Sequence, residues 1–150
     1  MVTVTDLARL ACEQVFEGYG VPVHVRRRSS RDDCGWFGMI DLTGDGVHAT
    51  LLLSPNTEAL RRSYPLEGQP TPDWVGELLN QVAGRLQNDL GSRGARVTIG
   101  TPWVVPDRRG QERCGTEEPE VVLSVRADVA PGFELKEPEA GPASGDLILF

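Results

Sequence analysis

The sequence predicts an α+β domain in which helices form a layer on one side of a mostly antiparallel β-sheet. Two segments repeat apolar residues at helical spacing, shorter segments alternate apolar and polar residues, and two adjacent strand-like runs are joined by a short turn. Both halves of the chain begin with a helix followed by a strand, which hints at an internal duplication. The residues themselves do not repeat.

The first helix and the first strand fill the amino-terminal part of the chain. Thr5 is the expected N-cap, because its hydroxyl can accept a hydrogen bond from a free backbone N–H of the first turn. Apolar residues then recur every three to four positions until Gly18, where glycine favours the end of the helix. Residues 21–28 alternate as a half-buried strand does, and the polar residues 29–35 predict a turn.

A β-hairpin and a short helix follow. The apolar runs 36–42 and 47–53 are joined by the Gly- and Asp-rich residues 43–46, a pattern typical of two antiparallel strands and their turn. Pro55 suits the first position of a helix, so we expect a short helix over residues 55–63.

The second half contains the longest helical pattern of the chain. Residues 66–72 are rich in proline and glycine and predict a loop. Asp73 is the expected cap of a helix that continues to about Leu90. Residues 97–105 read as a strand, in which Pro102 indicates an edge position or a bend.

The remaining residues predict one more strand and a tail. Residues 107–119 are charged and predict a loop, and residues 121–129 predict a strand. We therefore expect a single domain over residues 1–129. Residues 130–150 form a tail rich in proline, glycine and glutamate, with a candidate last strand at 146–150.

Composition excludes several classes of function. Among the 150 residues, 22 acidic residues outnumber 15 basic ones, and the net charge of −7 does not suit a nucleic-acid-binding protein. No apolar run approaches the roughly 20 residues that span a bilayer, and the amino terminus lacks the pattern of a signal peptide. The three cysteines are widely spaced and odd in number, unlike a secreted disulfide framework. We expect a cytoplasmic protein that acts at neither a membrane nor a nucleic acid.

The long helix carries the candidate functional residues. On a helical wheel, one side collects Asp73, Glu77, Asn80, Gly84 and Asn88. The other side is apolar and is expected to face the sheet; it consists of Val75, Leu78, Leu79, Val82, Ala83, Leu86 and Leu90. Glu77 and Asn80 are three residues apart, so their side chains are neighbours. A polar pair of this kind is also common on an ordinary solvent-facing helix, and its meaning depends on context.

That context is a family resemblance. The pattern Asp73-x-x-x-Glu77-x-x-Asn80, followed a little over twenty residues later by Pro102, resembles the signature of the CheC, CheX and FliY phosphatases. The resemblance extends in order over residues 5–128 and includes the hairpin and the short helix before the signature. The proline falls one residue earlier here than in the family pattern. The single Glu-x-x-Asn motif is the arrangement of CheX.

The resemblance implies a phosphatase that removes the aspartyl phosphate of a CheY-like response-regulator receiver domain in two-component chemotaxis signalling. It implies that Asn80 orients the attacking water and that Glu77 pairs with a lysine of the partner. Asp73 and Gly84 are expected on the partner-binding surface, Asp73 chiefly as a helix cap and Gly84 as room for a partner loop. It also implies a homodimer. The alternative is a non-catalytic receiver-binding or adaptor module with the same fold.

The sequence offers no metal site or cofactor site of its own. The opening of an EF-hand loop is matched by Asp41, Thr43, Asp45 and Gly46. The twelfth position is Leu52, where a glutamate is needed, so a hairpin turn is the better interpretation. The Mg²⁺ that the reaction needs is expected in the partner receiver domain.

Overall fold

The computed structural model describes residues 2–27, 36–105 and 118–138. These residues form three helices and a six-stranded sheet. The elements in chain order are α1 (Val4–Gly18), β1 (His24–Arg27), β2 (Phe37–Gly44), β3 (Val47–Pro55), α2 (Thr57–Ser63), α3 (Pro72–Ser92), β4 (Val97–Ile99), β5 (Trp103–Val105) and β6 (Glu120–Val129).

The sheet is mostly antiparallel, as expected. Its strands follow the order β1-β6-β3-β2-β4, and β5 pairs with β2 next to β4. All pairings are antiparallel except that of β1 with β6, which is parallel. The two halves of the chain therefore differ in how their first strand joins the sheet, since β1 runs parallel to its neighbour and β4 antiparallel.

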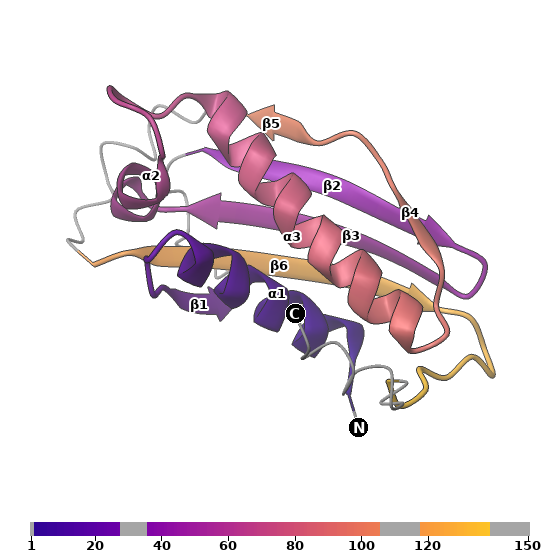
Figure 1. Cartoon of the computed structure of the whole chain (residues 1–150). Helices are drawn as coiled ribbons and strands as arrows, with labels where there is room; N and C mark the ends of the chain where they lie inside the picture. Colours follow the sequence, from indigo (N-terminus) through magenta and orange to yellow (C-terminus); the bar gives the residue numbers. More distant parts are fainter. Residues whose placement is uncertain (1, 28–35, 106–117, 139–150) are drawn as a thin grey trace, which may run out of the picture.

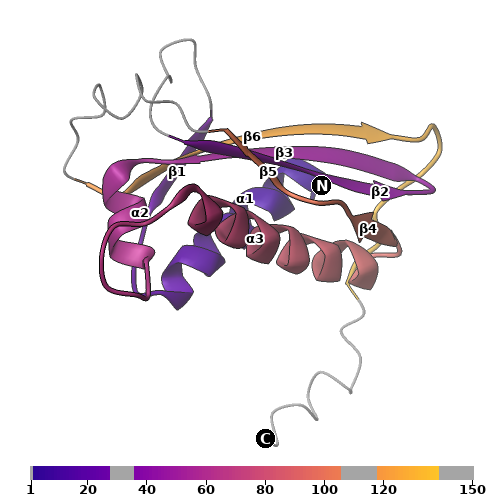
Figure 2. The same ribbon diagram turned by 90° about the horizontal axis from the view of Figure 1, so that it is seen from above.

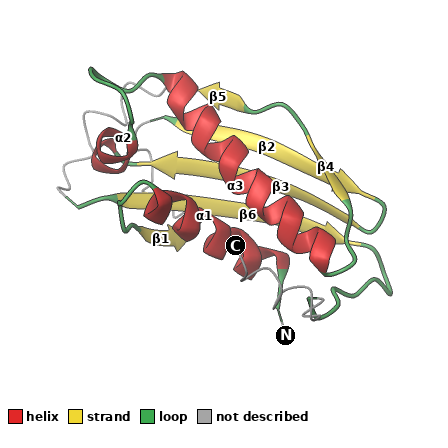
Figure 3. Cartoon of the chain, viewed as in Figure 1, coloured by secondary structure: helices red, strands yellow, loops and turns green. Residues whose placement is uncertain are grey.

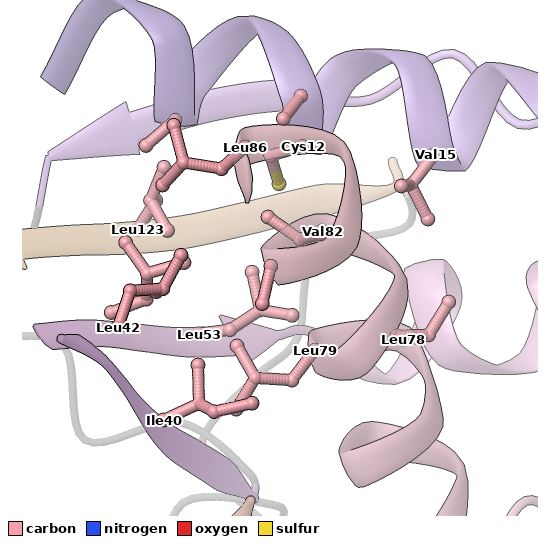
Figure 4. Close-up of a cluster of buried hydrophobic side chains, with 14 of the residues drawn as sticks. Cys12, Val15, Ile40, Leu42, Leu53, Leu78, Leu79, Val82, Leu86 and Leu123 are labelled. Carbon is pink, nitrogen blue, oxygen red and sulfur yellow. The ribbon is translucent and has the colours of Figure 1, made fainter. Parts of the chain in front are cut away.

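The three helices lie on the same face of the sheet (Figures 1 and 2). The helices and strands form two layers, and α1 and α3 lie side by side across the strands (Figure 3). Apolar side chains from α1, α3 and the sheet fill the space between the layers (Figure 4). The apolar side of α3 predicted from the wheel is buried, and Trp74 joins it at 8% exposure. The predicted α+β architecture is confirmed.

The hairpin forms as predicted, and alternation fixes which residues enter the core. β2 and β3 pair so that Ile40 lies opposite Leu51 and Leu42 opposite Ala49. These four side chains are at most 1% exposed, while the residues between them face away from the helices. A period of two residues in the sequence thus becomes one buried face of the sheet.

The expected cap of the first helix was wrong. Thr3, not Thr5, is the N-cap of α1: its hydroxyl accepts from the Asp6 N–H at 3.1 Å, and the Asp6 carboxylate accepts from the Thr3 N–H at 3.1 Å. This reciprocal capping box satisfies two free donors, whereas Thr5 alone would satisfy one, and the helix begins two residues earlier for that reason.

The other two helix starts also differ from the prediction. Pro55 ends β3 and Asn56 caps α2, accepting from the Ala59 N–H at 2.8 Å. Asp73 does not cap α3, because Pro72 already occupies the first turn and places Asp73 inside the helix. A carboxylate in the first turn is still favoured by the partial positive charge of the helix amino terminus.

The strand expected over residues 97–105 is broken at the predicted bend. β4 and β5 are separate short strands, and the Gly100 N–H between them donates to the Asp41 carbonyl at 2.8 Å, so both stay attached to β2. The turn expected at 29–35, most of the loop expected at 107–119 and the candidate strand at 146–150 lie outside the described residues. Among the described helices, none combines the length and apolar composition needed to cross a membrane.

Candidate functional site

The candidate site is the solvent-facing stripe of α3. Asp73, Glu77 and Asn80 are exposed and Gly84 is half-buried, while the opposite side of the helix packs on the sheet. The four residues therefore share one surface, as the wheel predicted. Because α3 is pinned along its length by buried leucine and valine side chains, this surface is presented on a rigid support.

Gly84 is a position on the stripe that carries no side chain. A Cβ atom built at this position would meet no other heavy atom within 4 Å. Since glycine adds no side chain, the backbone of α3 is open to close approach from the solvent side one turn beyond Asn80.

Pro102 lies beside the beginning of the stripe. A Cβ atom at Gly76 would be 3.9 Å from the Pro102 Cγ atom and 3.4 Å from a methyl of Val104. The segment before β5 therefore packs against α3 at Gly76, one turn before Asn80. Pro102, which follows the Glu-x-x-Asn motif in the sequence pattern, is thus close in space to the helix that carries the motif.

The two polar side chains of the motif differ in how the protein holds them. Glu77 accepts a long hydrogen bond of 3.4 Å from the Gln81 side-chain amide, and Gln81 also donates to the Tyr19 hydroxyl at 2.7 Å. No hydrogen bond within the described part of the chain engages the Asn80 side chain. Asn80 is therefore open to bind a molecule arriving from the solvent, while Glu77 already makes one long hydrogen bond.

Sequence reasoning missed Gln81 and Tyr19. The spacing of four residues between Glu77 and Gln81 was a usable signal, because side chains four apart on a helix are neighbours. Nothing in the sequence placed Tyr19 there, since it lies at the end of a different helix, 62 positions before Gln81.

The stripe is a convex surface, and two hollows formed by the described residues lie elsewhere. One of about 410 Å³ is lined by the β2–β3 turn, the end of α3 and Phe133, and another of about 500 Å³ lies between α1, β1 and β6. Within the described part of the chain, no group of three or more His, Cys, Asp or Glu side chains is arranged to hold a metal ion.

Comparison with known proteins identifies the architecture. No protein-family model matches the sequence, and no curated protein matches it. Solved structures do match: a CheC-like superfamily protein from Shewanella sp. PV-4 superposes with a TM-score of 0.62 at 17% identity, over 84% of this chain and 91% of that one. The fold is that of the CheC-like and CheX proteins.

Two further structures agree with the CheX-like fold. The chemotaxis protein CheX from Vibrio vulnificus gives a TM-score of 0.58 at 15% identity, covering 70% of this chain and 75% of that one. A chain of the CheX–CheY–BeF3–Mg²⁺ complex from Borrelia burgdorferi gives a TM-score of 0.53 at 15% identity, covering 91% of this chain and all of that one (100%). The expected CheC/CheX-like fold is therefore confirmed.

Proposed function

We propose that this chain hydrolyses the aspartyl phosphate of a CheY-like receiver domain, with Asn80 and Glu77 as the residues that act on the partner. The observation that carries the proposal is the joint exposure of these two side chains on one face of α3 in a chain with the CheX-like fold. The CheX protein of Borrelia burgdorferi, which shares this fold, forms a complex with CheY.

In the proposed reaction this chain mainly has to position a water molecule. An acyl phosphate is already reactive, so hydrolysis requires a water molecule in line with the phosphorus–oxygen bond that breaks. The water oxygen bonds to phosphorus, the aspartyl carboxylate leaves with the bonding electron pair, and the protons of the water pass to phosphate and solvent. The Asn80 amide oxygen can accept a hydrogen bond from the water and aim its lone pair, while the amide NH₂ donates elsewhere.

Glu77 is suited to docking. An exposed carboxylate can form a charge-assisted hydrogen bond with a lysine of the partner, which fixes the register of the two proteins. Gly84 leaves room for a partner loop one turn further on, and Asp73 lies at the amino-terminal end of the same surface. In this proposal the Mg²⁺ belongs to the receiver domain, and this chain needs no cofactor of its own.

The test is the decay of a receiver domain labelled with acetyl phosphate in the presence of Mg²⁺. We expect wild-type protein to accelerate the decay and Asn80→Ala to lose the acceleration while keeping the fold and most of the binding. Asn88→Ala, an exposed asparagine further along α3, is the matched control and should behave as wild type. Equal turnover by Asn80→Ala and wild type would refute the mechanism. A folded sample that binds receivers but accelerates none would favour the adaptor function.

Homodimerisation in the cytoplasm is part of the same proposal. Trp103 on the short strand β5 is 65% exposed, whereas Trp74 is buried, so Trp103 is the better candidate for an interface anchor. Sedimentation should give a dimer for the wild type and a weakened dimer for Trp103→Ala. A monomeric wild type would contradict this part of the proposal.

A further inference from the structure

A chain of contacts runs from α1 to the carboxylate of Glu77. The Gln81 side-chain nitrogen donates to the Tyr19 hydroxyl at 2.7 Å and to a Glu77 carboxylate oxygen at 3.4 Å. A primary amide carries two hydrogens, so one nitrogen can serve both acceptors at once. Gln81 therefore bridges the exposed carboxylate on α3 to a residue at the end of α1.

Tyr19 is a fixed point for this bridge. Its ring packs edge-on against Trp74, with ring centroids 5.3 Å apart and planes at 81°. The Trp74 indole N–H donates to the Ser63 hydroxyl at 3.0 Å, and the Tyr19 backbone N–H donates to the Phe16 carbonyl at 3.0 Å. Both the ring and the backbone of Tyr19 are thus held, and its hydroxyl offers an anchor that moves little.

Anchoring matters because Glu77 is exposed. A free glutamate samples several rotamers, and docking onto a cation must then select one of them at the expense of affinity. A carboxylate that already accepts a hydrogen bond from an anchored amide has fewer conformations to lose. Asn80 has no corresponding contact within the described residues, so the bridge acts on one member of the motif and leaves the other alone.

We propose that Gln81 and Tyr19 are positioning residues that hold the Glu77 carboxylate in the orientation that receives the partner's lysine. This inference rests on the proposed function, and it assigns the two residues to docking. Neither touches the reacting atoms. Their removal is expected to raise KM and Kd by about 2- to 5-fold, because the 3.4 Å bond to Glu77 is longer than usual and belongs to the weaker part of the range for one hydrogen bond. The kcat value should stay within about twofold, since the water is placed by Asn80.

Two variants remove the bridge without disturbing the packing. Gln81→Met keeps the side-chain length and a similar helix propensity but has no donor. Tyr19→Phe keeps the ring against Trp74 and removes only the hydroxyl. As a control, Gln87→Met deletes a hydrogen bond of the same kind, from the Gln87 side chain to the Val97 carbonyl at 2.9 Å, at a site remote from Glu77. The control should lower Tm and leave KM unchanged.

The experiment measures kcat and KM for the labelled receiver, and Kd for the receiver loaded with BeF3 and Mg²⁺. We expect Gln81→Met and Tyr19→Phe to raise KM and Kd alike. If Gln81 acts through Glu77, Gln81→Met should have no further effect in a Glu77→Ala background.

The outcomes separate this inference from the function on which it rests. If the wild-type protein binds or dephosphorylates a receiver, and Gln81→Met and Tyr19→Phe leave KM and Kd unchanged, the role of the bridge is wrong and the proposed function stands. Additive losses in the double variant with Glu77→Ala also overturn it. A folded wild type that neither binds nor dephosphorylates any receiver overturns both proposals. Should Gln81→Met fail to fold, Tyr19→Phe carries the test.

Discussion

Under the proposed function, replacing Gly84 with alanine should stabilise the protein and weaken its binding to a receiver domain. Gly84 lies in the interior of the 21-residue helix α3, where glycine is less favourable than alanine because its unfolded chain has more conformational freedom to lose. The backbone at Gly84 does not have a positive φ, and an added Cβ would meet no heavy atom within 4 Å. Alanine can therefore take this place without strain.

The two effects have different sizes and opposite signs. Exchanging a helical glycine such as the half-buried Gly84 for alanine is worth about 1 kcal/mol in the free energy of unfolding. For a domain of this length that corresponds to a rise in Tm of about 2–4 °C. On the docking surface, an extra methyl between closely packed backbones costs about 1–3 kcal/mol. The Kd for the receiver should then rise by about 5- to 150-fold, since a factor of ten is about 1.4 kcal/mol.

The assay pairs thermal unfolding followed by circular dichroism with titration of a receiver loaded with BeF3 and Mg²⁺. Gly91→Ala is the matched control: its Cβ also meets nothing within 4 Å, but it lies two turns further along, near the end of α3. It should raise Tm slightly and leave Kd unchanged. A lower Tm for Gly84→Ala would refute the open geometry around Gly84. A higher Tm with an unchanged Kd would refute its part in docking.

Three other predictions concern stability and reactivity. Leu86 is fully buried, so Leu86→Ala should lower the free energy of unfolding by about 2–5 kcal/mol, and a loss below 1 kcal/mol in denaturant titration would contradict its place in the core. Burial raises the pKa of the Cys12 thiol to about 12. In a variant whose other two cysteines are replaced by serine, a thiol reagent at pH 8 should therefore react with Cys12 only after unfolding. Rapid labelling of the native variant would contradict this prediction. The Thr3 backbone N–H donates to the Asp6 carboxylate and holds the pKa of that carboxyl below its ordinary 3.8. The ionised Asp6 therefore stabilises the fold above pH 3.8, and this stabilisation is lost as the pH falls through the lower pKa of the folded state. Asp6→Asn should make Tm less sensitive to pH below about 4, and parallel Tm curves for the variant and wild type would rule this out.

Local periodicity explains why much of the fold could be predicted from the sequence. The seven apolar residues assigned to one side of the long helix are all buried, and the hairpin pairs in the register that its alternation implies. Both features depend on spacings of two to four residues, which the sequence displays directly. Helix caps were less predictable, because several residues near a helix start can accept the same hydrogen bond. At α1, the reciprocal pair formed by Thr3 and Asp6 outcompetes Thr5.

Contacts between distant segments could not be predicted in the same way. The exposed stripe of α3 followed from the wheel, but the anchoring of Glu77 depends on which helix lies beside α3 and in which direction it runs. The hydrogen bond between Gln81 and Tyr19 joins two helices that are separated in the chain by the hairpin and α2. The parallel pairing of β1 with β6 could not be predicted from the sequence for the same reason, because it joins the two ends of the domain.

The shape of the site has a consequence for where selectivity resides. Glu77 and Asn80 project from a convex helix, and the hollows of about 410 and 500 Å³ lie at other places on the molecule. A convex surface cannot by itself exclude bulk water or surround a phosphoryl group, so under the proposed function the reaction centre is complete only when the receiver covers the stripe. Residues that shape the contact, such as Gly84 and the Gln81 bridge, should then change Kd and KM, while Asn80 alone should change kcat. Discrimination between receivers would follow from the fit along α3, because every receiver presents the same aspartyl phosphate to the same asparagine.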